Sequence, residues 1–479
     1  MERYFSMIVR YSWLVVFLTI ALTCLLMSQI RHLQVIIDPN TFLPQEHPYV
    51  ITTNTVEDLF GSKYLVVIGL IPRQGDILQK HILEKVRRIT NELSKHPRVV
   101  KGNLLSVSAR RAKSISGDMD GMNVQPLMAH VPETDEERKL LQQAIESNPV
   151  YLNTVVSDDF HTTAIMVEFR NGPDGYRGMI NAAESIIKNE RDETVDIILG
   201  GTPVFISYLE RYSERMAVLL PIGLLIIGFI QYLAFRSIQG LFLPLLTAIL
   251  AVAWGLGLMG ATGISMDVFN STTPILILAI SAGHAVQVLK RYYEEYYRLL
   301  DGSQLTRREA NIQAVVASLK KIAPVMIVAC GVAALGFYSL VVFGLTSVRV
   351  FGIFTGTGIL STLLLELTFI PALRSLLPPP GDRERDTQVR RSFSHWIVSG
   401  IANLVTGSNK RTVVIIGSLV ILAATGVPKV VVESSTKSFF SKNLDFRQHD
   451  QILNSRLGGT NTVHFVFQGT SQDAVKDPR

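Results

Sequence analysis

Apolar residues gather in seven long stretches of the chain, and the segments between these stretches are polar. Each stretch has roughly 16 to 24 residues, near the length at which a helix crosses a hydrocarbon core about 30 Å thick. The pattern therefore predicts seven membrane-spanning helices, at about Ser12 to Ile30, Met216 to Phe235, Leu241 to Ala261, Thr273 to Leu289, Ile322 to Phe343, Val350 to Leu373 and Thr412 to Val427.

The polar region between the first two spans, residues 32–214, alternates strand and helix patterns. β-rich runs predict four strands, at Tyr64 to Ile71, Val99 to Val107, Thr163 to Phe169 and Val195 to Leu199. Helical spacing of apolar residues or helix-start signals predict helices at Ile77 to Leu93, Asp135 to Ser147 (with Thr134 as N-cap and Glu137 completing a capping box) and Tyr176 to Asn189. Two strand–helix–strand units separated by an insertion predict an α+β domain of the ferredoxin-like kind. The fold class is thus a polytopic α-helical membrane protein with an α+β domain in water.

The remaining segments follow from the same pattern. Residues 1–31 hold the start of the chain and the first span, residues 215–377 a five-span core, and residues 412–428 the seventh span. Tyrosines interleaved with charges predict an interfacial helix within residues 291–321, and a polar linker with a second interfacial helix fills residues 378–411.

Charge and composition narrow the class further. The 479 residues carry a net charge of +6, but Lys and Arg cluster beside the spans, which does not point to nucleic acid. The basic loops lie after the second, fourth and sixth spans, so the positive-inside rule puts the N-terminus in the cytoplasm and both polar domains outside. Cys24 and Cys330 lie in apolar spans, so no disulfide is implied. No phosphate-binding Gly-Lys-Ser/Thr loop is present, which favours an ion gradient over ATP, and no cofactor is expected.

The end of the chain resembles its beginning. Lys410 to Val432 repeats the basic flank, apolar span and β-rich exit of Arg10 to Ile37, and Thr462 to Gln468 after Leu457-Gly458-Gly459 resembles the first strand after Leu59-Phe60-Gly61. We therefore expect residues 429–479 to be the start of a second outer domain, in a chain that is the first half of a longer transporter. A lone strand cannot bury itself, so this segment is not expected to fold stably alone. The other interpretation is an ordinary small tail.

The order of these elements resembles the resistance-nodulation-division (RND) superfamily, and most closely its MMPL-type exporters, which are related to the sterol-sensing domain. The resemblance rests on Gly201-Thr202-Pro203-Val204, Phe235-Arg236-Ser237, Leu243-Pro244-Leu245, Gly263 to Asp267, Lys290-Arg291-Tyr292 with Glu294-Glu295, and Phe369-Ile370-Pro371-Ala372-Leu373. It implies a periplasmic porter domain at residues 32–214, a bacterial inner membrane, and a transporter rather than an enzyme.

One departure from the family concerns the fourth span. Many MMPL-type exporters carry an Asp-Tyr pair there, taken to relay protons, and the matching positions in this chain are Gly283 and His284. An ionisable residue inside a span is costly and suggests function. His284 is therefore the first candidate for a proton relay, because an imidazole gains and loses a proton near neutral pH. Glu366 of the sixth span is its candidate partner, about 7 Å away in depth if both helices are straight.

Less specific interpretations stand beside these. His284 is also consistent with a structural histidine that bonds a neighbouring helix, or with a contact to the substrate. Glu366 is also consistent with a position near the cytoplasmic interface, to which its side chain would snorkel. Gln287, about one turn further on, is a candidate to hydrogen-bond His284, and a simple interhelical contact is as good an explanation. We expect close helix packing at Gly283, Gly331, Gly352 and Gly356. The histidines of the outer domain show no metal-ligand spacing, and no metal site is predicted.

The sequence thus predicts a secondary exporter driven by the proton-motive force, with a lipid or other hydrophobic amphiphile as cargo. Its expected partners are this substrate and the bilayer, a homo-oligomer (trimer or monomer left open) and a periplasmic carrier protein. Two rivals remain: a lipid- or sterol-sensing regulator that does not pump, and a Sec-type accessory factor of protein export. Substrate, coupling ion and direction of transport are not fixed by the sequence.

Overall fold

The computed structural model describes residues 1–60, 64–118, 121–170, 172, 174–302, 304–380, 399–400, 402, 409–431 and 435–460. The chain divides into two compact units. One consists of Met1–Pro44 and Ser213–Glu433, and the other of Gln45–Tyr212 and Ser434–Arg479. We call them the helical unit and the sheet unit.

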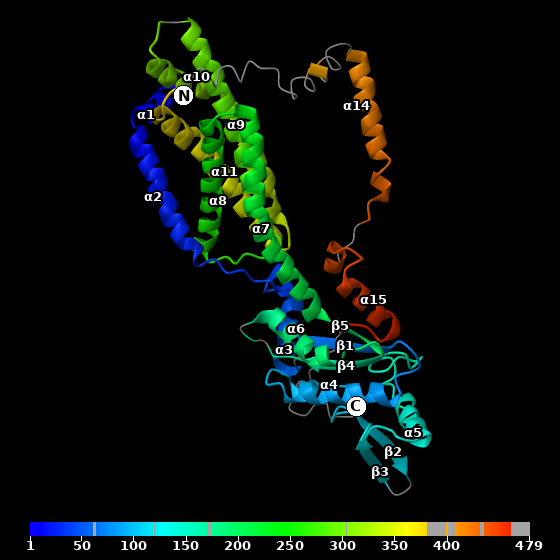
Figure 1. The fold of residues 1–479 in the computed structure, drawn as a ribbon. Coiled ribbons are helices and arrows are strands. Elements are labelled where there is room, and N and C mark those ends of the chain that lie inside the picture. The colour runs from blue at the N-terminus through cyan, green and yellow to red at the C-terminus, as the bar shows by residue number, and fades with distance from the viewer. Residues whose placement is uncertain are drawn as a thin grey trace. The chain divides into compact units, whose positions relative to one another are not determined.

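The described residues contain seven helices long and apolar enough to cross a membrane, which confirms the prediction in number and place (Figure 1). They are α2 (Ser12–Ile30), α7 (Thr202–Phe235), α8 (Ile238–Thr262), α9 (Thr273–Gly302), α10 (Arg307–Tyr338), α11 (Thr346–Leu376) and α14 (Asn409–Ala424), and a short α1 (Glu2–Arg10) precedes them. The protein is therefore a polytopic membrane protein.

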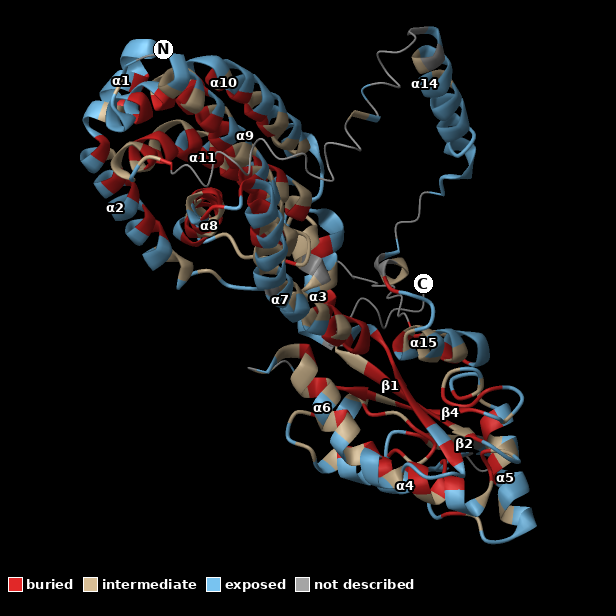
Figure 2. Ribbon diagram, turned by 45° about the horizontal axis from the view of Figure 1, so that its top comes forward, coloured by how far each residue is buried: buried red, intermediate tan, exposed pale blue. Residues whose placement is uncertain are grey.

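The helices α8, α9 and α11 lie at the centre of the helical unit. In the most apolar stretch of each, 56%, 50% and 56% of residues are buried, against 22% in α2 and 17% in α10. In Figure 2 the buried colour can be followed along α11, whereas the outer surface of α2 is largely exposed. A helix that is apolar on all sides and exposed along its length is suited to a lipid environment rather than to water.

The segment at residues 291–321 differs from the predicted interfacial helix. Its described residues form no separate helix: α9 continues to Gly302 and α10 begins at Arg307, so they belong to the ends of two long candidate spans. Tyr292, Tyr293 and Tyr296 are only 2%, 1% and 0% exposed. Their spacing continues the apolar face of α9, so the three rings pack in the core of the helical unit. Most of the second predicted interfacial helix lies outside the described residues.

The sheet unit is built on a three-stranded antiparallel sheet. Its strands are β1 (Leu65–Pro72), β4 (Thr163–Glu168) and β5 (Val195–Gly200), in the order β4-β1-β5. In the register, Ile68 of β1 lies opposite Ile165 and Leu199. The helices of this unit between residues 45 and 190 are α3 (Pro48–Phe60), α4 (Lys80–Lys95), α5 (Asp135–Glu146) and α6 (Gly175–Ile187). Helices α4 and α6 lie together on one face of the sheet (Figures 1 and 2).

The predicted strand at Val99 to Val107 does not form. Val99 and Leu105 make single antiparallel bridges to Phe169 and Met166, and a 3-10 turn at Lys101–Asn103 separates them. Gly102 and Asn103 favour such a turn, which prevents a continuous ladder. The insertion that follows contains a hairpin that the sequence pattern did not reveal, β2 (Lys113–Asp118) and β3 (Gly121–Pro126). Its Ser, Gly, Asp and Asn residues have low strand propensity.

The segment after Val427 also differs from its expectation. Helix α15 (Asp445–Arg456) packs on the sheet, with Leu453 fully buried among Val67, Ala164 and Ile198. Two glycines make this close approach possible, because a Cβ added at Gly69 or Gly200 would collide with Leu453. The segment therefore finds its partner in the sheet formed by residues 65–200. The predicted strand Thr462 to Gln468 lies outside the described residues.

The predicted capping box at the start of α5 is present. Thr134 Oγ1 accepts from the Glu137 N–H at 3.2 Å, and the Glu137 carboxylate accepts from the N–H of Thr134 at 3.4 Å and of Glu133 at 2.8 Å. These backbone donors, that of Glu133 first, lower the pKa of Glu137.

We expect Thr134→Ala to weaken α5 by about 1 kcal/mol, because it leaves a helix N–H without its acceptor. In the full-length protein, hydrogen exchange of the α5 amides would then be several-fold faster. Thr134→Ser keeps the hydroxyl and serves as the control. Equal exchange in the alanine and serine variants would show that the box does not stabilise the helix.

Candidate functional site

Three neighbouring helices of the helical unit bring one ionisable side chain each to a common point. His284 comes from α9, Cys330 from α10 and Glu366 from α11. His284 Nδ1 lies 3.7 Å from Glu366 Oε2 and 3.2 Å from Cys330 Sγ. We call these three residues the His–Cys–Glu cluster.

The three side chains of the cluster differ in how far they are exposed. The side chain of Glu366 is 0% exposed and that of His284 is 19% exposed, while Cys330 is buried. Neither carboxylate oxygen of Glu366 has a hydrogen-bond partner in the described part of the chain. An isolated carboxylate in apolar surroundings is costly, so Glu366 must either carry a proton or pair with a protonated His284.

Of the three relay candidates predicted from the sequence, two meet in the structure and one does not. The structure places His284 and Glu366 side by side, without the gap in depth that the straight-helix estimate gave. Gln287 is exposed on α9, and no hydrogen bond joins it to His284, so it does not belong to the cluster. Cys330 was missed as a site residue. Its signal in the sequence was weak, because a cysteine in an apolar span is also a common packing residue.

Buried hydroxyl groups extend from the cluster along α9 and α11. Ser281 and Thr362 are 0% exposed, and their hydroxyls have no hydrogen-bond partner among the described residues. Thr362 precedes Glu366 by one helical turn, and Ser281 precedes His284 by three residues. Further toward the N-terminal ends of the two helices, Thr355 Oγ1 lies 3.5 Å from Thr273 Oγ1. Buried polar groups of this kind are commonly satisfied by ordered water.

The four glycines predicted to mediate packing divide into two pairs. A Cβ at Gly352 would collide with the carbonyl oxygen of Phe337, and one at Gly356 would lie 3.0 Å from the Tyr338 ring, so both allow α11 to approach α10. The prediction of close packing was wrong for Gly283 and Gly331, because no heavy atom lies within 4 Å of an added Cβ at either position. Each faces away from the neighbouring helices of the described structure.

A second buried polar group ties the central helices together near the C-terminal end of α11. Arg374 is 2% exposed, and its guanidinium donates to the Tyr292 hydroxyl at 2.7 Å and to the side-chain oxygen of Gln239. The Tyr292 hydroxyl in turn donates to Asn311 Oδ1 at 2.6 Å. This network joins α8, α9, α10 and α11 and fixes the helices that carry the His–Cys–Glu cluster.

The donor atoms of the cluster all lie within 4.8 Å of one another, a spacing that by distance alone would also admit a metal ion. His284 and Cys330 already lie at hydrogen-bonding distance, and we interpret the cluster as a hydrogen-bonded one. Of the outer-domain histidines, those at 32, 47, 81, 130 and 161 are exposed and His96 is half-buried.

Seven candidate spans with an ionisable cluster between three of them define the class: a polytopic membrane protein with an ionisable site inside its helical unit. The sequence profile of the MMPL family matches residues 78–408, more than half of the chain. The protein belongs to the MMPL family, whose members are transporters.

A relative supports this assignment. The chain is 25% identical over 288 residues to ActII-3 of Streptomyces coelicolor (strain ATCC BAA-471 / A3(2) / M145), whose name describes it as a membrane protein. The match covers 57% of this chain and 39% of the relative. The chain thus spans well under half the length of the relative it matches.

Proposed function

We propose that the protein is a secondary exporter of lipids or other hydrophobic amphiphiles, driven by the proton-motive force across a bacterial inner membrane. The observation that carries the proposal is the contact of His284 with Glu366 at 3.7 Å inside the bundle. An imidazole and a carboxylate at this distance can share one proton in two ways, as a neutral pair or as an ion pair. A second proton leaves the imidazole charged and the acid neutral.

Protonation would act on the helices through the net charge of the His284–Glu366 pair. With one proton the pair balances its charge, and with two it carries a net positive charge that the apolar bundle must accommodate. Because the three residues sit on three different helices, the preferred helix arrangement differs between the two states. The side chain of His284 is 19% exposed, whereas that of Glu366 is fully buried. We therefore assign the exchange of protons between the cluster and its surroundings to His284.

The row of buried hydroxyls supplies a path for that exchange. Ser281 and Thr362 lie on the same helices as His284 and Glu366, N-terminal to them and without hydrogen-bond partners in the described residues. Waters bound to these hydroxyls would connect the cluster to the N-terminal ends of α9 and α11. The proposal places these ends on the periplasmic side.

The orientation and the architecture outside the membrane belong to the same proposal. The excess of Lys and Arg after the second, fourth and sixth spans supports a cytoplasmic N-terminus and a periplasmic sheet unit. The strand order β4-β1-β5 and the bridges of Val99 and Leu105 to residues of and next to β4 support a ferredoxin-like porter domain with a reduced edge strand. This domain would handle the cargo.

One observation favours a different function, a lipid-binding regulator that does not pump. The fourth span carries Gly283 and His284 where the usual relay has an acidic residue. The close contact of His284 with a carboxylate from α11 supports the pump, since it restores an acid to the site from another helix.

Proton flux in liposomes distinguishes the two functions. The full-length protein is reconstituted with a trapped pH-sensitive dye, a pH gradient is imposed, and candidate amphiphiles are added to the membrane. We expect the gradient to dissipate faster with protein and amphiphile together than with either alone, and a sodium gradient of the same size to have no effect. If no flux appears while the protein still binds the lipids, the regulator is the better assignment.

A further inference from the structure

The His–Cys–Glu cluster offers one each of the three kinds of side chain that bind zinc in proteins. His284, Cys330 and Glu366 supply a ring nitrogen, a sulfur and a carboxylate oxygen, and these atoms all lie within 4.8 Å of one another. Among the residues that the structure describes, no other group of three or more His, Cys, Asp and Glu side chains converges in this way. The three ligands come from α9, α10 and α11, so an ion bound here would join three helices.

The distances within the cluster are close to those between ligands of one zinc ion. Zinc–ligand bonds at tetrahedral angles place the ligand atoms about 3.3 to 3.6 Å apart. His284 Nδ1 lies 3.2 Å from Cys330 Sγ and 3.7 Å from Glu366 Oε2. The third pair, Cys330 Sγ and the carboxylate, is no more than 4.8 Å apart, and a rotation of the carboxyl group can shorten it. Hydrogen-bonded pairs and ligands of one ion have similar separations, so the hydrogen-bonded cluster is also a nearly formed set of zinc ligands.

Glu366 gives an independent sign that the cluster takes a ligand. Its side chain is 0% exposed and its Oε2 faces His284. Neither carboxylate oxygen has a hydrogen-bond partner in the described part of the chain. A buried carboxylate without a partner is costly, and a cation bound to it removes that cost.

The charge of the three ligands selects a divalent ion of the zinc type. Zinc binds cysteine as a thiolate and the acid as a carboxylate, so these two negative charges and a neutral imidazole balance the charge of the ion. A net charge of zero is what an apolar bundle accommodates at the least cost. A monovalent copper ion would leave a net negative charge, and Mg²⁺ and Ca²⁺ prefer oxygen ligands.

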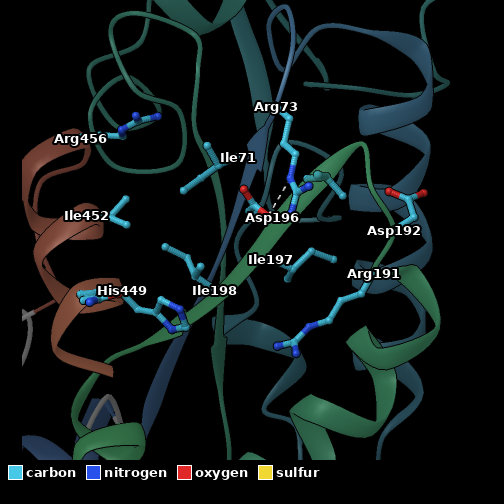
Figure 3. A pocket seen from close by; sticks show the side chains of 12 residues that line it. Ile71, Arg73, Arg191, Asp192, Asp196, Ile197, Ile198, His449, Ile452 and Arg456 are labelled. Carbon is cyan, nitrogen blue, oxygen red and sulfur yellow. Dashed lines mark hydrogen bonds and ion pairs between the residues drawn. The ribbon is translucent and has the colours of Figure 1, made fainter. Parts of the chain in front are cut away.

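A pocket in the sheet unit does not compete for this role. It has a volume of about 590 Å³, and its lining includes His449, Asp192 and Asp196 (Figure 3). Asp196 accepts from Arg73 Nη2 at 2.7 Å, and Asp192 accepts from Lys85 Nζ at 2.6 Å. A metal ion would have to displace both cations, so the pocket holds no preformed set of metal ligands.

We propose that the cluster binds one Zn²⁺ ion through His284, Cys330 and Glu366, and that the bound ion stops transport. Bonds from one ion to α9, α10 and α11 hold the three helices in a single arrangement, and the ion occupies the two groups to which the proposed function assigns the proton. The side chain of His284 is 19% exposed, which gives the ion access from the surface of the helical unit. The binding site stands on its geometry, whereas the inhibition rests on the proposed function.

Zinc binding is measured first, on the full-length protein purified in detergent through a tag without histidine. Competition with a coloured zinc chelator gives the affinity and the number of ions. We expect one tightly bound Zn²⁺ per chain, unaffected by excess Mg²⁺ or Ca²⁺. Cys330→Ser should weaken binding by about 100-fold or more, because even a group behind a ligand is worth about 10- to 100-fold. Cys24→Ser changes the exposed cysteine of α2 and is the matched control, with wild-type affinity expected.

A cobalt spectrum shows whether the sulfur itself binds the ion. With Co²⁺ in place of Zn²⁺, a thiolate ligand produces a charge-transfer band in the near ultraviolet. We expect this band in the wild type and in Cys24→Ser, and its loss in Cys330→Ser. If Cys330→Ser does not elute as a folded protein in size-exclusion chromatography, His284→Gln takes its place in the affinity measurement. Wild-type zinc affinity in a folded Cys330→Ser or His284→Gln variant would overturn the site, as would a cobalt complex without the thiolate band.

Proton flux in liposomes tests the inhibition and separates it from the proposed function. At a Zn²⁺ concentration ten times the measured Kd, amphiphile-dependent flux should fall about tenfold in the wild type and in Cys24→Ser, and a chelator should restore it. Flux that persists at this concentration overturns the inhibition. Flux in a protein that binds no zinc rejects the site and leaves the exporter. Zinc binding that depends on Cys330, in a protein without any flux, rejects the pump and leaves the metal site.

Discussion

Replacing Glu366 with glutamine is expected to lower amphiphile-dependent proton flux on the order of 100-fold, the usual cost of removing a positioned proton carrier. Glutamine keeps the size of the buried side chain but cannot take up a proton, so the His–Cys–Glu cluster loses its acid. His284→Gln should have an effect of similar size, because Glu366 then has no base at 3.7 Å. Flux is measured in liposomes with a trapped pH dye at equal amounts of reconstituted protein.

The double variant shows whether the two residues act together. If they share one proton, His284→Gln and Glu366→Gln combined should cost little more than either alone, a clear departure from additivity. Gln287→Ala, an exposed neighbour on α9, is the matched control and should keep wild-type flux. Wild-type flux in Glu366→Gln, or strictly additive losses, would remove the pair from the relay and favour a structural histidine.

The second large effect is expected at the contact between α10 and α11. Gly352→Ala should destabilise the helical unit by about 1–3 kcal/mol, since the new Cβ collides with the backbone oxygen of Phe337 and the helices must separate. Gly331→Ala is the matched control on α10. It meets open space, and alanine is the better helix former, so it should be neutral or stabilising by up to about 1 kcal/mol.

The midpoints of thermal unfolding of the two variants and the wild type are compared in detergent. The folded fraction that remains after heating is measured by size-exclusion chromatography. We expect a lower midpoint for Gly352→Ala than for the wild type, and an unchanged or higher one for Gly331→Ala. Equal midpoints in the two variants would show that the helices adjust at no cost, and that the glycine does not determine the packing.

Several elements could be predicted because their signal is local. An apolar run of the right length crosses a membrane whatever its neighbours, so α2, α7, α8 and the other spans were found in place. The strands β1, β4 and β5 and the Thr134 cap follow equally from nearby residues. Local signals failed where a segment could serve two structures: the tyrosines of α9 have the composition of an interfacial helix, but their spacing continues a spanning one.

The candidate site shows the same division. His284 and Glu366 were found from the sequence, because an ionisable residue inside an apolar span stands out by its cost. Their separation, and the presence of Cys330 beside them, depend on how α9, α10 and α11 pack. Which residues meet between two helices depends on the sizes of the side chains of both helices along the whole contact, as at Gly352 and Gly356. The sequence of a single span therefore does not predict these contacts.

The sequence by itself therefore determined the membrane class, the number of spans in the described chain, the main strands and two of the three residues of the His–Cys–Glu cluster. Only the tertiary structure decided that these residues touch, that Gly283 and Gly331 do not mediate packing, and that α15 docks on the sheet through Leu453. The physical reason is the range of the interactions. Hydropathy and capping act within a few turns of chain, whereas the contacts of His284 with Glu366 and of Leu453 with Gly69 join segments whose distance is set by packing.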